Sequence, residues 1–157
     1  MDEVIDIYSK GEYPASVLSN FYPNGFVFEG VECASMEGFL QSLKFRNPKR
    51  QLEVCLLTGG DAKKAGNRKF LWRWTGNVFW QGKRLRRTGE EFSRLVFAAY
   101  KAMFEQNEIF RKALLGTKGK KLAHSIGRSD KRKTILTEKE FLDALNGLRE
   151  FGQGDYL

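Results

Sequence analysis

Three polar residues recur at helical spacing early in the chain, and their side chains are of kinds that often serve in catalysis or binding. Glu37, Gln41 and Lys44 follow the i, i+4, i+7 period, which places a carboxylate, an amide and an amine along one face of a helix. A carboxylate can transfer protons, and an amine can act as a nucleophile or bind phosphate. The line predicts one wall of a pocket, although periodicity alone also fits a solvated helix face.

The helix that carries these residues is expected to begin at Ser35, a good N-cap residue. An adjoining face has the spacing of a buried stripe, formed by Met36, Phe39, Leu40 and Leu43. Asn47-Pro48 should end the helix or bend the chain after it. Before the helix, turn signals at Asn24-Gly25 and Glu29-Gly30 predict a small hairpin. The sequence thus predicts a hairpin followed by an amphipathic helix.

The next segments combine turns with positive charge. Residues 51–58 predict an apolar helix, after which Asp61 should cap a short helix over 61–66. Because free amides at a helix N-terminus attract anions, this junction with Lys63 and Lys64 could bind a phosphate. The alternative is a plain helix cap with two surface lysines.

Residues 67–87 are the densest basic and aromatic stretch of the chain. Aromatic rings that stack on bases, between cations that pair with phosphates, are typical of a nucleic-acid platform. Residues 78–83 also fit a strand and turn whose aromatic side chains belong to the core. We expect most of the tryptophans to be buried and one of them, Trp80, to contact a substrate.

The remaining pattern is mostly helical. Capping boxes at Thr88/Glu91 and Thr137/Glu140 predict a central core helix over 90–105 and a terminal helix. Asn107 should cap a helix over 108–115, a basic loop follows over 118–133, and the tail 152–157 should fray. With an edge strand expected over 4–8, the fold class is α+β. The chain reads as a helix-rich single domain, 1–157, with a few short antiparallel strands near the N-terminus.

Composition bounds the partners and the compartment. The net charge of +8 and the pI near 9.6 favour phosphate-bearing ligands, either nucleotides or nucleic acid. Neither an apolar run of membrane length nor an N-terminal signal is evident, so a cytoplasmic protein is expected. Cys33 and Cys55 should be buried thiols, because two cysteines and one histidine cannot form a usual zinc site. We therefore expect no metal and no cofactor.

Two sequence runs resemble the signature of the NADAR family, also called YbiA-like. They are LSNFYP at 18–23 and SMEGFLQSLKF at 35–45, with an F-x-F-x-G-V segment between them. The second run matches the family's E-x-x-x-Q-x-x-K-F helix. Residues 61–66, 101–107 and 114–117 resemble its A-x-x-x-G, K-F-x-Q-N and L-L-x-T segments. The resemblance is collinear and extends from about residue 18 to 149.

This resemblance implies an N-glycosidase that cuts a bond between a ribose anomeric carbon and a nitrogen. The family is associated with ADP-ribose on guanine bases of nucleic acid and with phosphorylated ribosylamino intermediates of riboflavin synthesis. By this match Glu37 serves in acid/base catalysis, and Lys44 either forms a Schiff base with the opened sugar or binds phosphate. Asn20 and Phe21 would contact the base or sugar, and Gln41 would orient Glu37 or a ribose hydroxyl.

The last third of the chain departs from the usual family pattern. Its 124–130 segment, HSIGRSD, resembles members associated with phage genomes, which would place the protein in the host cytoplasm. Asp130 is the nearest match to a second catalytic carboxylate, and His124 and Arg128 are candidate substrate ligands. The expected partner is an ADP-ribosylated nucleotide or nucleic acid. An inactive basic module that only binds nucleic acid is the alternative from another class.

Overall fold

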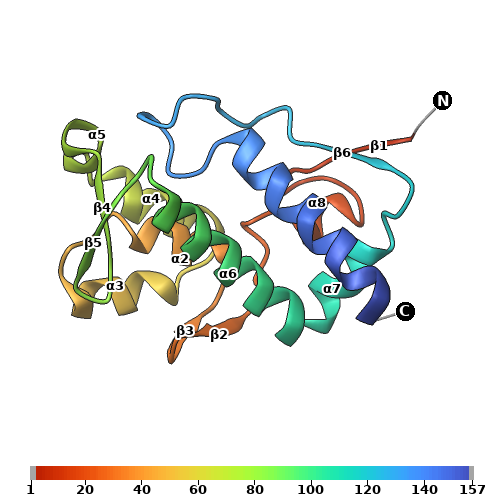
Figure 1. The fold of residues 1–157 in the computed structure, drawn as a ribbon, viewed down its shortest axis with the longest axis horizontal. Coiled ribbons are helices and arrows are strands. Elements are labelled where there is room, and N and C mark those ends of the chain that lie inside the picture. The colour runs from red at the N-terminus through yellow and green to blue at the C-terminus, as the bar shows by residue number, and fades with distance from the viewer. Residues whose placement is uncertain (1–2, 156–157) are drawn as a thin grey trace.

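In the computed structural model, which describes residues 3–155, eight helices combine with three separate two-stranded pairs (Figure 1). The strands β2 (Phe26–Phe28) and β3 (Val31–Cys33) form the antiparallel hairpin predicted near the N-terminus. A second antiparallel hairpin joins β4 (Asn77–Trp80) to β5 (Lys83–Arg86). The helix-rich α+β prediction is therefore confirmed.

The third pair brings distant parts of the chain together. β1 (Val4–Asp6), within the expected edge strand, lies parallel to β6 (Lys121–Ala123), with Val4 opposite Lys121. The sequence did not indicate this partner, because a short parallel pair leaves no local turn signal. The pair fixes the start of the segment that follows β6 beside the N-terminus of the chain.

The first helices pack around α2. They are α1 (Ala15–Leu18), α2 (Met36–Ser42), α3 (Pro48–Cys55) and α4 (Gly59–Asn67). All seven residues of α2 are buried, so it is a core helix. Two predicted boundaries were wrong: the helix predicted over 51–58 is α3, which starts at Pro48 with Asn47 as its cap, and Asp61 lies in the first turn of α4 instead of capping it. Proline suits that first helical position because its missing N–H has no partner there.

The later helices form the other half of the core. They are α5 (Leu71–Thr75), α6 (Glu90–Gln106), α7 (Glu108–Leu115) and α8 (Glu138–Asp155). Figure 1 shows α6 running through the middle of the molecule with α8 beside it. Aromatic side chains of both helices, including Phe92, Tyr100, Phe104 and Phe141, are buried in the main core with those of α2. The predicted central role of the helix over 90–105 is thus confirmed.

The capping predictions had different outcomes. Asn107 caps α7 by accepting from the Phe110 amide, and Thr137 and Glu140 form the expected reciprocal box at α8. The Thr88/Glu91 box was wrong: α6 starts after Gly89 without a side-chain cap, and Glu91 pairs with Lys83 at 2.6 Å. The Glu91 carboxylate, which the local pattern assigned to the helix cap, therefore pairs with a lysine of the neighbouring β4–β5 hairpin.

Part of the predicted tail belongs to α8. α8 continues through Asp155, and Gly152 is buried against the Phe104 ring, so residues 152–155 do not fray. The rest of the predicted tail, 156–157, lies outside the described residues. Within the described residues no helix has both the length and the apolar character needed to cross a membrane.

Candidate functional site

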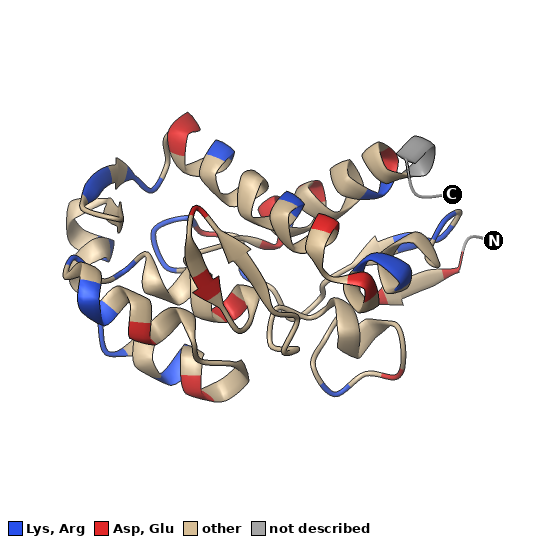
Figure 2. Ribbon diagram, turned by 90° about the horizontal axis from the view of Figure 1, so that it is seen from below, with Lys and Arg blue, Asp and Glu red and all other residues tan. Residues whose placement is uncertain are grey.

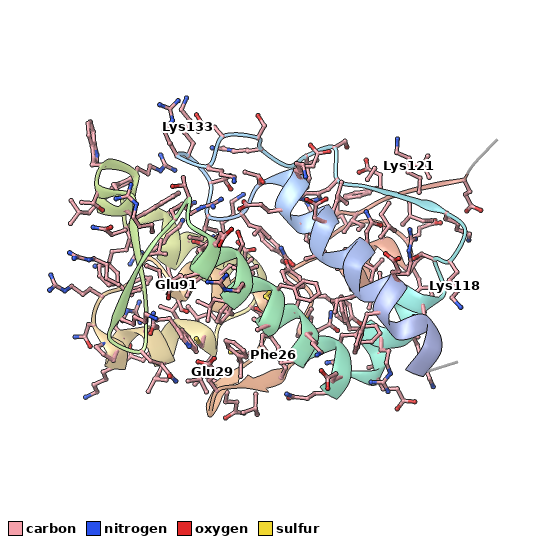
Figure 3. All side chains as sticks on the ribbon, viewed as in Figure 1. Phe26, Glu29, Glu91, Lys118, Lys121 and Lys133 are labelled. Carbon is pink, nitrogen blue, oxygen red and sulfur yellow. The ribbon has the colours of Figure 1, made fainter. Side chains whose placement is uncertain are left out.

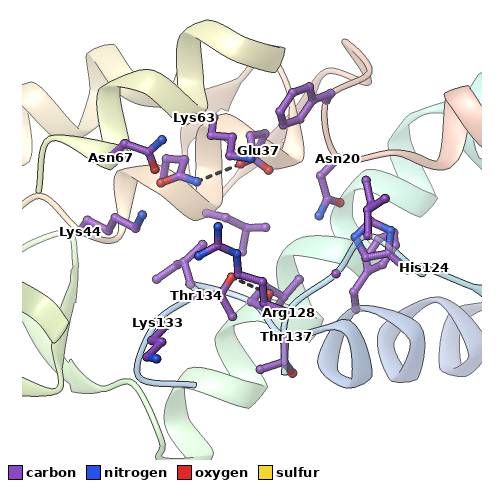
Figure 4. A pocket seen from close by; sticks show the side chains of 18 of the residues that line it. Asn20, Glu37, Lys44, Lys63, Asn67, His124, Arg128, Lys133, Thr134 and Thr137 are labelled. Atoms are coloured by element: carbon purple, nitrogen blue, oxygen red, sulfur yellow. Dashed lines mark hydrogen bonds between the residues drawn. The ribbon is translucent and has the colours of Figure 1, made fainter. Parts of the chain in front are cut away.

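A cavity of about 630 Å³ opens between α2 and the segment 124–137, which connects β6 to α8 (Figure 4). One wall carries side chains of α2 and α4, and the facing wall carries side chains of the connecting segment. The loop before β2 and the start of α5 complete the rim. The volume is in the range of cavities that hold nucleotide-sized ligands.

The start of α2 is held on three sides, which fixes the wall that it forms. Ser35 caps the helix by accepting from the Gly38 amide at 3.0 Å, and its hydroxyl donates to the Leu57 carbonyl at 2.8 Å. The Glu37 amide donates to the Asn20 carbonyl at 3.0 Å. A Cβ on Gly38 would lie 2.5 Å from the Leu57 carbonyl oxygen, so only glycine allows this close approach of α3.

Glu37 lines the cavity as a nearly buried carboxyl group, with 9% of the residue exposed. Burial raises the pKa of Glu37, although the Gln41 hydrogen bond and the nearby charges of Lys63, Lys44 and His124 act in the opposite direction. Gln41 Nε2 donates to Glu37 Oε1 at 2.9 Å, drawn as a dashed line in Figure 4. A carboxyl group held in this way can carry a proton nearer to neutral pH than an exposed glutamate can.

Gln41 is itself held by the neighbouring helix. A Cβ on Gly66 of α4 would overlap the Gln41 Oε1 atom, so α4 can approach α2 only because residue 66 is glycine. The A-x-x-x-G pattern at 62–66 therefore has a packing reason: Ala62 is fully buried and Gly66 faces the amide. This contact fixes the orientation in which Gln41 donates to Glu37.

Lys44, predicted on the same helix as Glu37, lies in the turn that follows α2; it lines the same cavity, also with 9% of the residue exposed. Burial lowers the pKa of Lys44 to about 8; Glu37 opposes this effect, whereas Arg73 and Lys63 add to it. The Nζ atom lies 5.3 Å from the centre of the Trp72 ring. At pH 7 about one tenth of such amines are neutral, against about three in ten thousand for an amine with the ordinary value of 10.5.

Asn20 presents one end of its amide to the cavity. The buried Tyr100 hydroxyl donates to Asn20 Oδ1 at 2.7 Å, and burial raises the pKa of Tyr100, which keeps this donor protonated. The bond leaves Asn20 Nδ2 to donate to a ligand. Phe21 follows on the same loop and also lines the cavity.

His124 and Arg128 come to the site from the facing wall. His124 Nδ1 lies 2.8 Å from the Ile7 carbonyl oxygen, and its ring packs edge-on against Phe141 at 4.9 Å. Since a carbonyl can only accept, Nδ1 carries the proton, and in neutral His124 the other ring nitrogen is an acceptor. In Figure 4 the Arg128 guanidinium reaches toward the wall formed by α2.

A buried ion pair holds the facing wall. Arg87, only 2% exposed, donates to both carboxylate oxygens of Glu140 at 2.7 and 3.0 Å and to the Thr134 carbonyl at 3.2 Å. Burial raises the pKa of Glu140, but the Arg87 and Thr137 hydrogen bonds outweigh it, so the pKa is lowered overall. Thr134 and Thr137 line the cavity, and Arg87 therefore positions them from outside it.

The structure brings eight of the ten predicted site residues into the cavity and leaves two outside. Those that line it are Asn20, Phe21, Glu37, Gln41, Lys44, Lys63, His124 and Arg128. Asp130 does not line it; its carboxylate accepts from the Arg132 amide at 2.9 Å and pairs with the Arg132 side chain. Trp80 packs against Phe28 and Phe39 in the core. The assignments of Asp130 as a second catalytic carboxylate and of Trp80 as a substrate ligand are therefore withdrawn.

Other cavity residues were not predicted individually. Asn67 follows Lys63 by one turn of α4, and this i, i+4 spacing could have identified it. Phe70 and Arg73 belong to the basic and aromatic stretch, whose exposed members the pattern could not separate from the buried ones. Lys133 lies in the basic loop, and Figure 3 shows it at the far end of the connecting segment from β6.

Positive charge predominates around the cavity. Among the described residues that line it, five are lysines or arginines, from the turn after α2, from α4 and α5 and from the connecting segment, and the one carboxylate is that of Glu37. Figure 2 shows further lysines and arginines at the end of the molecule that holds α3 and α5. The described residues contain no cluster of three metal-ligating side chains, and Cys33 and Cys55 are buried free thiols, as predicted. The arrangement suits an anionic, phosphate-bearing ligand.

The fold is that of a YbiA-like protein. The NMR structure of the E. coli protein YbiA superimposes on 96% of this chain and 85% of its own, with a TM-score of 0.64 and 21% sequence identity. The "Uncharacterized 17.1 kDa protein in Gp30-rIII intergenic region" of Enterobacteria phage T4 is 39% identical over 147 residues, or 93% of this chain and 97% of the T4 protein. The chain belongs to the bacteriophage protein GP30.3 family, whose model matches residues 12–150. The predicted phage-type YbiA-like protein is thereby confirmed.

Proposed function

We propose that the protein is an N-glycosidase that releases ADP-ribose from modified guanine, in a nucleotide or in nucleic acid. The observation that carries the proposal is a pair of buried groups, Glu37 on α2 and Lys44 in the turn just after it: a carboxyl group whose pKa is raised and an amine whose pKa is lowered, both lining one cavity. Such opposite shifts are typical of acid/base and nucleophilic residues. The NADAR resemblance supplies the reaction class, which the fold alone does not define.

The reaction proceeds through the Lys44 amine. The neutral amine attacks the anomeric carbon of the ribose while the bond to the guanine nitrogen breaks, and that nitrogen takes the electron pair and a proton from Glu37. The attached amine then loses one proton to water, Glu37 regains a proton from water, and the ribose ring opens to an imine as the second amine proton moves to the ring oxygen. Water then adds to the imine carbon and the amine leaves, so that free ADP-ribose and unmodified Lys44 result.

Geometry and charge support these roles. Glu37 lies on α2 and Lys44 lies seven residues later in the turn that follows it, and both line the cavity, so both can reach one bound ribose. The pyrophosphate of ADP-ribose would lie among the cationic side chains of the cavity. Lys63 and Arg128, which face each other across the cavity, could bind it from both sides (Figure 4). A phosphorylated riboflavin-pathway intermediate has fewer phosphate charges to match five cations, so we favour ADP-ribose.

The test is to incubate ADP-ribosylated guanosine monophosphate with the wild-type protein and with Glu37→Gln, Lys44→Met and the surface control Lys64→Met. We expect release by the wild type and by Lys64→Met, and a fall of at least a hundredfold for the other two. Sodium cyanoborohydride should trap ADP-ribose on the Lys44 peptide as a secondary amine, detected by mass spectrometry. Release by Lys44→Met at the wild-type rate would reject the imine step.

Two outcomes would replace the proposal itself. Turnover of phosphorylated ribosylamino compounds alone would assign the second substrate class of the resemblance. No release from any of these compounds, together with salt-dependent binding of unmodified nucleic acid, would indicate a module that only binds.

A further inference from the structure

The outer face of α5 exposes a row of large side chains that the fold does not use. Trp74 is 86% exposed, Leu71 72% and Phe70 58%, whereas Trp72, between them, is buried and anchors the helix beneath Lys44. Phe70 is the N-cap of α5 and Trp74 follows it by four residues, about one helical turn, so the two rings lie toward the same side. Because Phe70 lines the cavity and Trp74 does not, this face leads outward from the cavity.

The same part of the chain has an unusual charge balance. Between Asp61 and Glu90 the sequence contains nine lysines and arginines and neither aspartate nor glutamate: Lys63, Lys64, Arg68, Lys69, Arg73, Lys83, Arg84, Arg86 and Arg87. Arg87 is buried against Glu140 and Lys83 pairs with Glu91, but the others are exposed. Lys133 of the connecting segment lines the same cavity as Arg73 of α5 and adds a further cation. A partner that fits this surface is a polyanion.

We propose that the α5 face, defined as Phe70, Leu71, Arg73 and Trp74, docks the single-stranded nucleic acid that flanks the modified nucleotide. A base next to that nucleotide stacks on the Trp74 indole, and the strand phosphates lie along the surrounding cations. Exposed aromatic rings need unstacked bases, which a duplex does not offer. The proposal rests on the glycosidase function of the cavity and specifies its substrate as single-stranded nucleic acid in preference to a free nucleotide.

Trp74→Ala tests the surface without altering the cavity. The matched control is Ile109→Ala, which truncates an apolar residue of α7 with 60% exposure that does not line the cavity. Each protein is assayed for ADP-ribose release from a modified guanine within a DNA or RNA strand of about twelve nucleotides, and from the free modified nucleotide. Since one base stack is worth about a fivefold to hundredfold effect, Trp74→Ala should lower kcat/KM by about tenfold on a strand and leave the free nucleotide unchanged. Trp74→Phe, which keeps an aromatic ring, should retain most of the wild-type kcat/KM on the strand.

A binding assay separates this proposal from the proposed activity. Anisotropy with the unmodified labelled strand should show about tenfold weaker binding for Trp74→Ala than for Ile109→Ala, with a steep salt dependence in both. If the wild type releases ADP-ribose from no substrate, the activity fails, but this difference in binding would still support the docking surface. Equal binding by the two variants, or an equal loss of turnover on strand and free nucleotide, would overturn it. The DNA and RNA arms identify the preferred strand.

Discussion

Replacing Lys44 with methionine should make the protein more stable while it abolishes the proposed activity. The amine is almost buried, and burial lowers its pKa from 10.5 to about 8. A lowered pKa means that the folded state holds the charged amine at a cost relative to the unfolded chain. Methionine has a similar length and no charge, so it should fill the same space beside Trp72 without that cost.

The magnitude follows from the two pKa values. The difference between 10.5 and about 8 corresponds to about 3 kcal/mol, at about 1.36 kcal/mol for each tenfold step. The cost is fully present below pH 8, where both states hold the proton, and it disappears as the pH rises from 8 to 10.5. Loss of the cation–π contact with Trp72 offsets about 1 kcal/mol of the stability that Lys44→Met would gain. Lys44→Met should therefore gain between about 1 and 3 kcal/mol at pH 7 and almost nothing at pH 10.5.

Urea unfolding at several pH values measures this difference, with Lys64→Met as the control. Lys64 is exposed on α4, so its replacement should change the free energy of unfolding by less than about 0.5 kcal/mol. NMR titration of the lysine amines should show one signal, missing in Lys44→Met, that titrates near pH 8. If Lys44→Met is less stable than the wild type at pH 7, or its gain does not shrink with pH, Lys44 is a structural residue and the reasoning is wrong.

Two further predictions concern the supports of the cavity. Arg87→Met removes the buried partner of Glu140 and should cost about 3–5 kcal/mol, measured as a lower Tm and urea midpoint; a loss below about 1 kcal/mol would contradict the role of this ion pair. Gly66→Ala places a methyl group on the Gln41 amide and should cost about 1–3 kcal/mol and reduce turnover. Gly60→Ala on the same helix has open space at its Cβ and is the control, expected to be neutral or slightly stabilising. Equal effects of the two alanines would count against the packing argument.

Local sequence patterns predicted the α2 wall of the site because that wall is built from neighbours in the chain. The Ser35 cap, the buried stripe and the polar line from Glu37 to Lys44 all lie within ten residues, and the helical period alone relates them. What the period could not decide was whether the polar line faced solvent or a cavity. The wall opposite α2 decides that, and it comes from a segment about ninety residues later in the chain.

That facing wall could not be predicted because distant contacts hold it. The connecting segment 124–137 has no helix or strand of its own, and it is fixed by the parallel pairing of β6 with β1 and by the bonds of Arg87 to Glu140 and Thr134. Such contacts leave no spacing signal in the sequence. Asp130 shows the consequence: its position in the motif favoured a catalytic carboxylate, but a local turn with Arg132 uses its oxygens.

The buried polar residues of the first wall need a reason to be there. A segment as buried as 36–44, which is α2 and the turn after it, would be most stable with apolar residues at positions 37, 41 and 44, because a carboxyl group and an amine each lose hydration there. Glu37 accepts from Gln41, and the described part of the chain has no ion pair between Glu37 and Lys44, so an ion pair is not the reason for keeping both. A chain that served only as a nucleic-acid-binding surface would need cations on its rim and no carboxyl group inside. The cost borne at these two positions is therefore better explained by chemistry inside the cavity than by binding at its edge.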